Sequence, residues 1–196
     1  MNFPKTKTLH ETENFQLLDC GGMVGIKPLF TNVVVMPFTS DDQGLPLAVG
    51  VIKEPNPFRE DGHHISLVTG TTDDEDGDLL STAQRELYEE TGFNVPDIAK
   101  WYYLGSVTSS KFVDHEQPCF AVDVTGIIKE EPKTDGSSME QAAEFKFIPA
   151  NDVIKEKDIF IPGLFLKLFK YVLGMDIQTT SPDFEFGSTQ GDNTQA

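Results

Sequence analysis

A long helix over residues 78–91 most constrains what this chain can fold into. The segment is rich in Leu, Ala, Gln, Arg and Glu and contains neither Pro nor Gly, a composition that favours helix formation. Gly92 follows directly, where glycine commonly ends a helix in a left-handed conformation. Leu80, Ala83 and Leu87 recur at helical spacing, and we expect this apolar stripe to be buried against a sheet.

Three glutamates share one face of this predicted helix. Glu86, Glu89 and Glu90 lie at positions i, i+3 and i+4, so their carboxylates are neighbours. Like charges at this spacing repel one another, and a divalent cation would reverse the sign of the interaction. Clustered oxygen ligands suit Mg²⁺ or Mn²⁺, which take further ligands from water and substrate phosphates. A solvated acidic face without a metal is the alternative that these three residues leave open.

The rest of the chain predicts a domain of the α/β class. Short apolar runs between turn residues predict strands on both sides of the helix, and these runs cover residues 15–18, 33–37, 47–52, 65–68, 101–107, 120–124 and 143–148. A second helix is expected from Pro162 to Gly174, because large apolar residues repeat there at three- and four-residue intervals. We therefore expect a mixed sheet between helices, with the chemistry on the first helix.

This pattern divides the chain into three parts. Residues 1–30 form an N-terminal extension with short strands, and residues 31–174 form the catalytic domain. Residues 175–196 form a polar, acidic tail without Lys or Arg, which is expected to be disordered. Cys20 and Cys119 belong to no metal-binding pattern, so we expect two free thiols.

The charge balance limits the partners of this protein. It has 32 Asp and Glu residues against 15 Lys and Arg, a net charge of −17, which repels nucleic-acid polymers. A small phosphorylated substrate can still bind where cations screen the carboxylates. No apolar run approaches the roughly 18 residues of a membrane span, and the first 16 residues lack the apolar stretch of a secretory signal. We expect a cytoplasmic protein that does not bind membranes.

The predicted helix also resembles a family motif. Residues 85–93 match every fixed place in the second half of the Nudix box, R-E-U-x-E-E-x-G-U, where U is a bulky apolar residue. The resemblance implies a Nudix fold, a Mg²⁺ or Mn²⁺ cofactor, and hydrolysis of a nucleoside diphosphate linked to another moiety. It further implies that Glu86, Glu89 and Glu90 bind the metal, with Glu86 and Glu90 acting in catalysis. A main-chain carbonyl near Gly70 would be a further ligand.

The first half of the box departs from the family pattern. Gly70 is the opening glycine, but it lies one residue further from Arg85 than the pattern requires. The early Glu is absent, and we expect Asp76 or Asp78 to replace it at the turn from loop to helix. Arg85 would then be structural and tie the helix to that carboxylate, and Gly92 would end the helix.

Other site residues follow from the resemblance with less support from the motif. Many family members take the general base from a late loop, and here the loop before the last strand offers Glu140 and Glu144. We favour Glu140, although in other members the equivalent of Glu86 takes this role. Candidate substrate-binding residues are Lys53, Arg59 and Phe112.

The layout is closest to the ADP-ribose pyrophosphatase-like branch of the family. Yet residues 107–111 lack the proline that this branch usually carries downstream of the box glycine. ADP-ribose or another nucleoside diphosphate sugar is the expected substrate, with dinucleoside polyphosphates and nucleoside triphosphates as alternatives. In that branch the N-terminal strands swap or pack between subunits, which would produce a homodimer. Two further alternatives are a catalytically weak nucleotide sensor with the same fold and an acidic protein-interaction domain.

Overall fold

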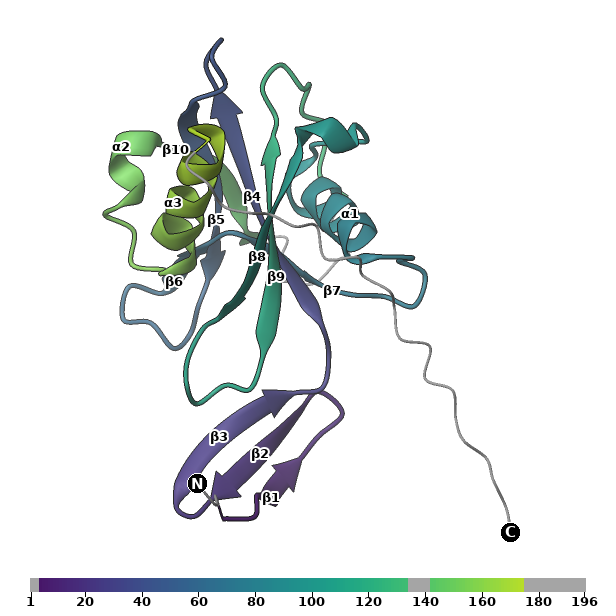
Figure 1. Ribbon diagram of the computed structural model, residues 1–196, viewed down its shortest axis with the longest axis vertical. Helices are drawn as coiled ribbons and strands as arrows, with labels where there is room; N and C mark the ends of the chain where they lie inside the picture. Colours follow the sequence, from purple (N-terminus) through teal and green to yellow (C-terminus); the bar gives the residue numbers. More distant parts are fainter. Residues whose placement is uncertain (1–3, 134–141, 175–196) are drawn as a thin grey trace.

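The computed structural model describes residues 4–133 and 142–174. A seven-stranded mixed sheet lies between helix α1 on one face and helices α2 and α3 on the other, and a three-stranded sheet lies beyond one end of it (Figure 1). The smaller sheet consists of β1 (Lys7–Glu11), β2 (Phe15–Cys20) and β3 (Met23–Pro28). The predicted α/β class, with a mixed sheet between helices, is confirmed.

The larger sheet is mostly antiparallel. Its strands are β4 (Asn32–Ser40), β5 (Pro46–Pro55), β6 (His63–Ser66), β7 (Val68–Thr71), β8 (Trp101–Thr108), β9 (Glu116–Asp123) and β10 (Glu144–Pro149). The helices are α1 (Leu79–Thr91), α2 (Ala150–Val153) and α3 (Phe160–Val172), with a 3₁₀ turn at Ile98–Lys100. The order is β10-β5-β4-β9-β8; β4 and β9 pair in parallel, and the other named strands of this sheet pair antiparallel.

One stretch of chain pairs with two different strands of the larger sheet. β6 pairs with β5, β7 pairs with β4, and the buried Leu67 lies between them. β4 and β5 pair with each other only at one end, where Phe38 lies opposite Val49, so β6 and β7 fill the space beyond. The single strand predicted at residues 65–68 is therefore wrong, because the pairing partner changes in the middle of that segment.

The core has one layer on each face of the larger sheet. On one face, Ala83 and Leu87 of α1 pack with Val33 and Val35 of β4, which confirms the predicted apolar stripe. On the other face α3 contributes its buried residues, namely Ile161, Leu164 and Leu168. β4 is buried on both faces, which explains its continuous apolar run. All buried members of both clusters lie at Val33 or later in the chain.

The elements that the sequence did not predict lack a strong apolar period. β1 is exposed at every residue, β3 contains Gly25 and Lys27, and α2 is only four residues long. α3 begins at Phe160 rather than at Pro162, because proline is tolerated anywhere in the first turn, where its missing N–H has no intrahelical partner. The tail at residues 175–196 lies outside the described residues, and the division of the chain into three parts stays a prediction.

Two smaller features bear on the sequence predictions. Cys20 and Cys119 are both free thiols, as predicted, and burial raises the pKa of the Cys119 thiol to about 12. Within the described part of the chain, no helix combines the length and the apolar character needed to cross a membrane.

Candidate active site

The loop from β7 leads into a capped helix terminus. Asp78 precedes α1 with an extended backbone, and its Oδ1 accepts hydrogen bonds from the Ser81 amide at 2.7 Å and from the Ser81 hydroxyl at 2.8 Å. These contacts satisfy an N–H group that the first helical turn leaves without a partner. Asp78, one of the two candidates for the early carboxylate, therefore starts the helix.

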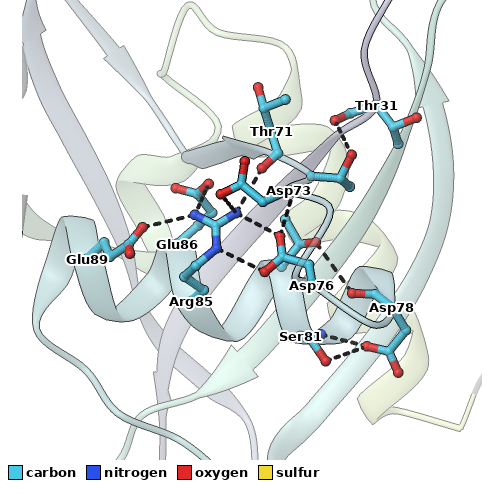
Figure 2. Close-up of polar contacts among 11 residues, drawn as sticks. Thr31, Thr71, Asp73, Asp76, Asp78, Ser81, Arg85, Glu86 and Glu89 are labelled. Atoms are coloured by element: carbon cyan, nitrogen blue, oxygen red, sulfur yellow. Dashed lines mark hydrogen bonds and ion pairs between the residues drawn. The ribbon is translucent and has the colours of Figure 1, made fainter. Parts of the chain in front are cut away.

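Asp76, the other candidate, holds Arg85 by two parallel contacts. Arg85 Nε donates to Asp76 Oδ1 at 3.0 Å, and Arg85 Nη2 donates to Asp76 Oδ2 at 2.7 Å (Figure 2). Arg85 Nη2 also donates to the carbonyl oxygen of Thr71 at 2.9 Å, and the Asp73 amide donates to Asp76 Oδ2 at 3.0 Å. The hydrogen bonds from Arg85 lower the pKa of Asp76 to about 2. This ion pair ties the loop to the middle of α1.

The same guanidinium group reaches the glutamates of α1. Arg85 Nη1 donates to Glu86 Oε1 at 2.7 Å and to Glu89 Oε2 at 3.0 Å. One cationic group thus lies between two of the three carboxylates, and Figure 2 shows it surrounded by acidic side chains from the loop and the helix. Arg85 therefore reduces the repulsion between Glu86 and Glu89 and orients both side chains.

Glu86 lies directly against the main chain of Gly70. A Cβ atom built on Gly70 would overlap Cγ, Cδ and Oε1 of Glu86, so only glycine leaves room for the side chain here. The Glu86 side chain is 13% exposed. Burial raises the pKa of its carboxyl group to about 7, and the nearby Arg85 only partly opposes this. Strongly perturbed carboxylates of this kind are concentrated at functional sites.

Glu90, the third glutamate, faces a small cavity between α1 and the larger sheet. The cavity has a volume of about 40 Å³ and is lined by Ile52, Glu54, Ser66, Leu67, Thr69, Glu90 and Ala143. Thr69 precedes Gly70, so the cavity borders the predicted metal position. Sequence reasoning missed Glu54, although a signal existed: Glu54 follows the buried Ile52 by two residues in β5, and alternate strand residues share a face.

The end of α1 is held by a segment distant in sequence. Gly92 has φ of +78°, and its amide donates to the carbonyl oxygen of Tyr88 at 2.8 Å. A Cβ atom on Gly92 would overlap the main-chain oxygen of Glu130, whose amide donates to the Gly92 carbonyl oxygen at 2.9 Å. The Tyr88 hydroxyl donates to Glu130 Oε2 at 2.8 Å. Gly92 therefore serves both the left-handed cap and the close approach of a second chain segment.

The donor atoms around α1 suit a hard divalent cation. The candidate ligands are all oxygen atoms, from the carboxylates of Glu86, Glu89 and Glu90 and from the main chain near Gly70. Across residues 4–133 and 142–174, no three His, Cys, Asp or Glu side chains converge on one point. Mg²⁺ usually keeps several waters and takes further ligands from substrate phosphates, so it does not need a complete set of protein ligands. The residues present therefore fit this ion without forming a closed cage.

Lys53 and Glu144 lie on the face of the sheet opposite to α1. Lys53 lies opposite Ile65 on β6 and opposite Glu144 on β10, and Ile65 packs into the core beneath α3. Opposite residues of paired strands share a face, so the Glu144 carboxylate is not directed at α1, which argues against it as the general base. Glu140, the favoured base, lies outside the described residues.

Arg59 and Phe112 lie in loops away from the cavity beside Glu90. Arg59 Nη2 contacts His64 Nδ1 at 2.7 Å, and His64 Nε2 contacts Asp158 Oδ2 at 3.1 Å, along a second cavity of about 150 Å³. Phe112 lies between β8 and β9, and its carbonyl oxygen accepts a hydrogen bond from the Ile26 amide at 2.7 Å. The structure brings neither residue to the cavity that Glu90 lines, and the substrate-binding roles of Lys53, Arg59 and Phe112 stay predictions.

Comparison with known proteins shows the fold and the family of this chain. Among solved structures, the chain is similar to an ADP compounds hydrolase with a TM-score of 0.62 and 15% sequence identity, over 89% of this chain and 95% of the other. This likeness shows a shared fold. No curated protein sequence matches the chain. A model of the NUDIX domain matches residues 29–168, and the predicted Nudix-type pyrophosphohydrolase is confirmed at the level of the family. Because this match spans the whole of the larger sheet and all of α1, the chain belongs to the Nudix domain family.

Proposed function

We propose that this protein is a Mg²⁺-dependent hydrolase that cleaves the pyrophosphate linkage of a nucleoside diphosphate joined to another moiety. The observation that carries the proposal is the contact between the half-buried Glu86 side chain and the main chain of Gly70. ADP-ribose or another nucleoside diphosphate sugar is the proposed substrate, supported by family membership and by the likeness to an ADP compounds hydrolase. Mn²⁺ is the other cation that such oxygen ligands suit.

The metal ligands proposed are Glu86, Glu89, Glu90 and the main-chain carbonyl of Gly70. When bound, the cation neutralises the diphosphate oxygens and lowers the pKa of a bound water. The protein fixes the positions of the ligand side chains. Asp76 holds Arg85 at two points, and Arg85 orients Glu86 and Glu89 through Nη1. Both glutamates are thus in place before the substrate arrives, which reduces the reorganisation needed for catalysis.

A general base is needed to take the proton from the attacking water. We propose Glu140 for this role, with Glu86 as the alternative. Glu140 is supported by the resemblance to family members that take the general base from a loop late in the domain, and it lies outside the described residues.

One experiment tests the activity. The purified protein is incubated with Mg²⁺ and a panel of nucleotides that contains ADP-ribose, other nucleoside diphosphate sugars, dinucleoside polyphosphates and nucleoside triphosphates, and the products are identified. We expect two phosphate monoesters from a diphosphate-linked substrate. Glu90→Gln should lower kcat by at least about 100-fold, because loss of a direct metal ligand exceeds the effect of an outer-sphere partner. A nucleotide that binds without turnover would instead identify a nucleotide sensor.

A thermal measurement tests the metal independently of turnover. Mg²⁺ or Mn²⁺ should raise the Tm of the wild type more than that of Glu90→Gln, because a ligand that binds only the folded state stabilises it. Equal shifts in the two proteins would place the cation elsewhere.

We also propose a homodimer formed through the N-terminal sheet. All buried members of the two core clusters lie at Val33 or later, so neither core is built on β1, β2 or β3. The large apolar residues exposed on these strands are Leu9, Phe15, Met23, Val24 and Ile26. A small sheet needs a covered apolar face to be stable, which supports a second copy as its partner.

The net charge of −17 argues against binding of nucleic-acid polymers. We further propose that the protein is cytoplasmic and does not bind membranes.

A further inference from the structure

Glu54 lies in β5 on the face of the larger sheet that α1 covers. In β5, Ile52 packs into the core cluster beneath α1, and Glu54 follows it by two residues on the same face. Glu54 and Glu90 both line the cavity of about 40 Å³. Glutamate residues from the sheet and from the helix thus border one small cavity.

The volume and lining of the cavity suit ordered water. A water needs roughly 10–15 Å³ of such space and two to four polar partners, and the cavity of about 40 Å³ offers Glu54, Ser66, Thr69 and Glu90. An ionised carboxylate only accepts hydrogen bonds. A water between two carboxylates would therefore donate one hydrogen to each, and its lone pairs would remain able to accept hydrogen bonds.

We propose that Glu54 is a positioning residue of the active site, which acts on Glu90 through water held in this cavity. The inference rests on the proposed function, because it gives Glu90 the role of a metal ligand. Glu54 adds a negative charge to the cavity that Glu90 lines and anchors the water that orients the Glu90 carboxylate. Outer partners of this kind keep a ligand in the geometry that binds the cation.

The test compares Glu54→Gln with the matched variant Glu60→Gln. Glu60 lies in the exposed loop between β5 and β6, so its substitution removes the same charge from the same hairpin without altering the cavity. Mn²⁺ affinity is measured by isothermal titration calorimetry, and kcat and KM are measured with the substrate found in the panel. We expect Glu54→Gln to weaken Mn²⁺ binding and to lower kcat, each by about 10–100-fold, with KM changed less than about twofold.

The outcomes separate this inference from the proposed function. Wild-type Mn²⁺ affinity and kcat in both variants would overturn the role of Glu54 while leaving the hydrolase intact. A wild-type protein that turns over no nucleotide would overturn the proposed function, and the calorimetric comparison would still decide whether Glu54 supports a cation site. Near-ultraviolet circular dichroism checks that each variant is folded. If Glu54→Gln fails to fold, Glu54→Asp is tested in its place. This variant keeps the charge but should bind Mn²⁺ more weakly than the wild type, because its shorter side chain misplaces the carboxylate. Unchanged Mn²⁺ affinity in Glu54→Asp would contradict the proposal.

Discussion

Gly92 and Glu130 join through their main chains: the Glu130 amide donates to the Gly92 carbonyl oxygen at 2.9 Å, and no Cβ atom fits between the two segments. Gly92→Ala should therefore cost more than a left-handed residue alone, which costs about 1–2 kcal/mol. We expect a loss of at least about 3 kcal/mol in the free energy of unfolding, measured by urea denaturation. Gly44→Ala is the control, because Gly44 has a similar φ of +79° with no atom within 4 Å.

Equal losses in the two glycine variants would mean that the Glu130 segment moves aside at little cost. A larger loss in Gly92→Ala alone would show that the end of α1 and the segment after β9 form one structural unit.

Gly70→Ala should separate activity from folding. The added Cβ atom would overlap the Glu86 side chain, which must then leave its place against the main chain. A displacement of about 1 Å in a catalytic group can cost about 100-fold in rate, and we expect a loss of that size in kcat. Gly77→Ala, in the loop between β7 and α1 with no atom near the added Cβ, should retain wild-type kcat. Matching rates in the two variants would show that the position of Glu86 is not critical.

Asp76→Asn should destabilise the protein in a pH-dependent way. The pKa of Asp76 is lowered to about 2 from its ordinary value of 3.8, so the ion pair with Arg85 stabilises the fold fully above about pH 4 and is lost as the pH falls through 2. The shift corresponds to about 2 kcal/mol at pH 7. The difference in unfolding free energy between wild type and Asp76→Asn should shrink by about 1 kcal/mol between pH 7 and pH 3. A difference independent of pH would assign the effect to packing.

Much of the site could be predicted because its signals are local. Helix α1 with its three glutamates and its terminal glycine is encoded in consecutive residues, and so is its apolar stripe. The choice between Asp76 and Asp78 needed the structure, because both lie near the start of the helix and only their contacts differ. The two residues take different tasks, one as the partner of Arg85 and one as the helix cap.

Contacts between distant segments could not be predicted from one sequence. Glu130 meets Gly92 only because the segment after β9 returns to the end of α1. The place of Glu54 beside Glu90 depends on which face of β5 the helix covers, and the same fact directs Lys53 to the other face. Short elements such as α2 carry too few residues for a period to be visible.

If the protein forms the proposed dimer, a single substitution in the N-terminal sheet should lower its molecular mass in solution from that of a dimer to that of a monomer. Val24 is 46% exposed on β3, and Val24→Asp would place a charge in the contact between the two copies, where a charge without a partner is strongly unfavourable. We expect sedimentation equilibrium to show a dimer for the wild type and a monomer for this variant. Phe58→Asp is the control, because Phe58 is 96% exposed in the loop between β5 and β6. A monomeric wild type would contradict the dimer.

The loop ahead of α1 is one residue longer than the family pattern and contains a tight turn, where the Asp76 amide donates to the Asp73 carbonyl oxygen at 3.0 Å and the Gly77 amide to that of Glu75 at 3.2 Å. In this longer loop, Asp76 meets the guanidinium group of Arg85. A search pattern that counts residues between the opening glycine and the arginine would reject this chain, whereas one that asks for an acidic group opposite the guanidinium would accept it. Loop length at this turn is thus a poor guide to whether the ion pair with the arginine is present.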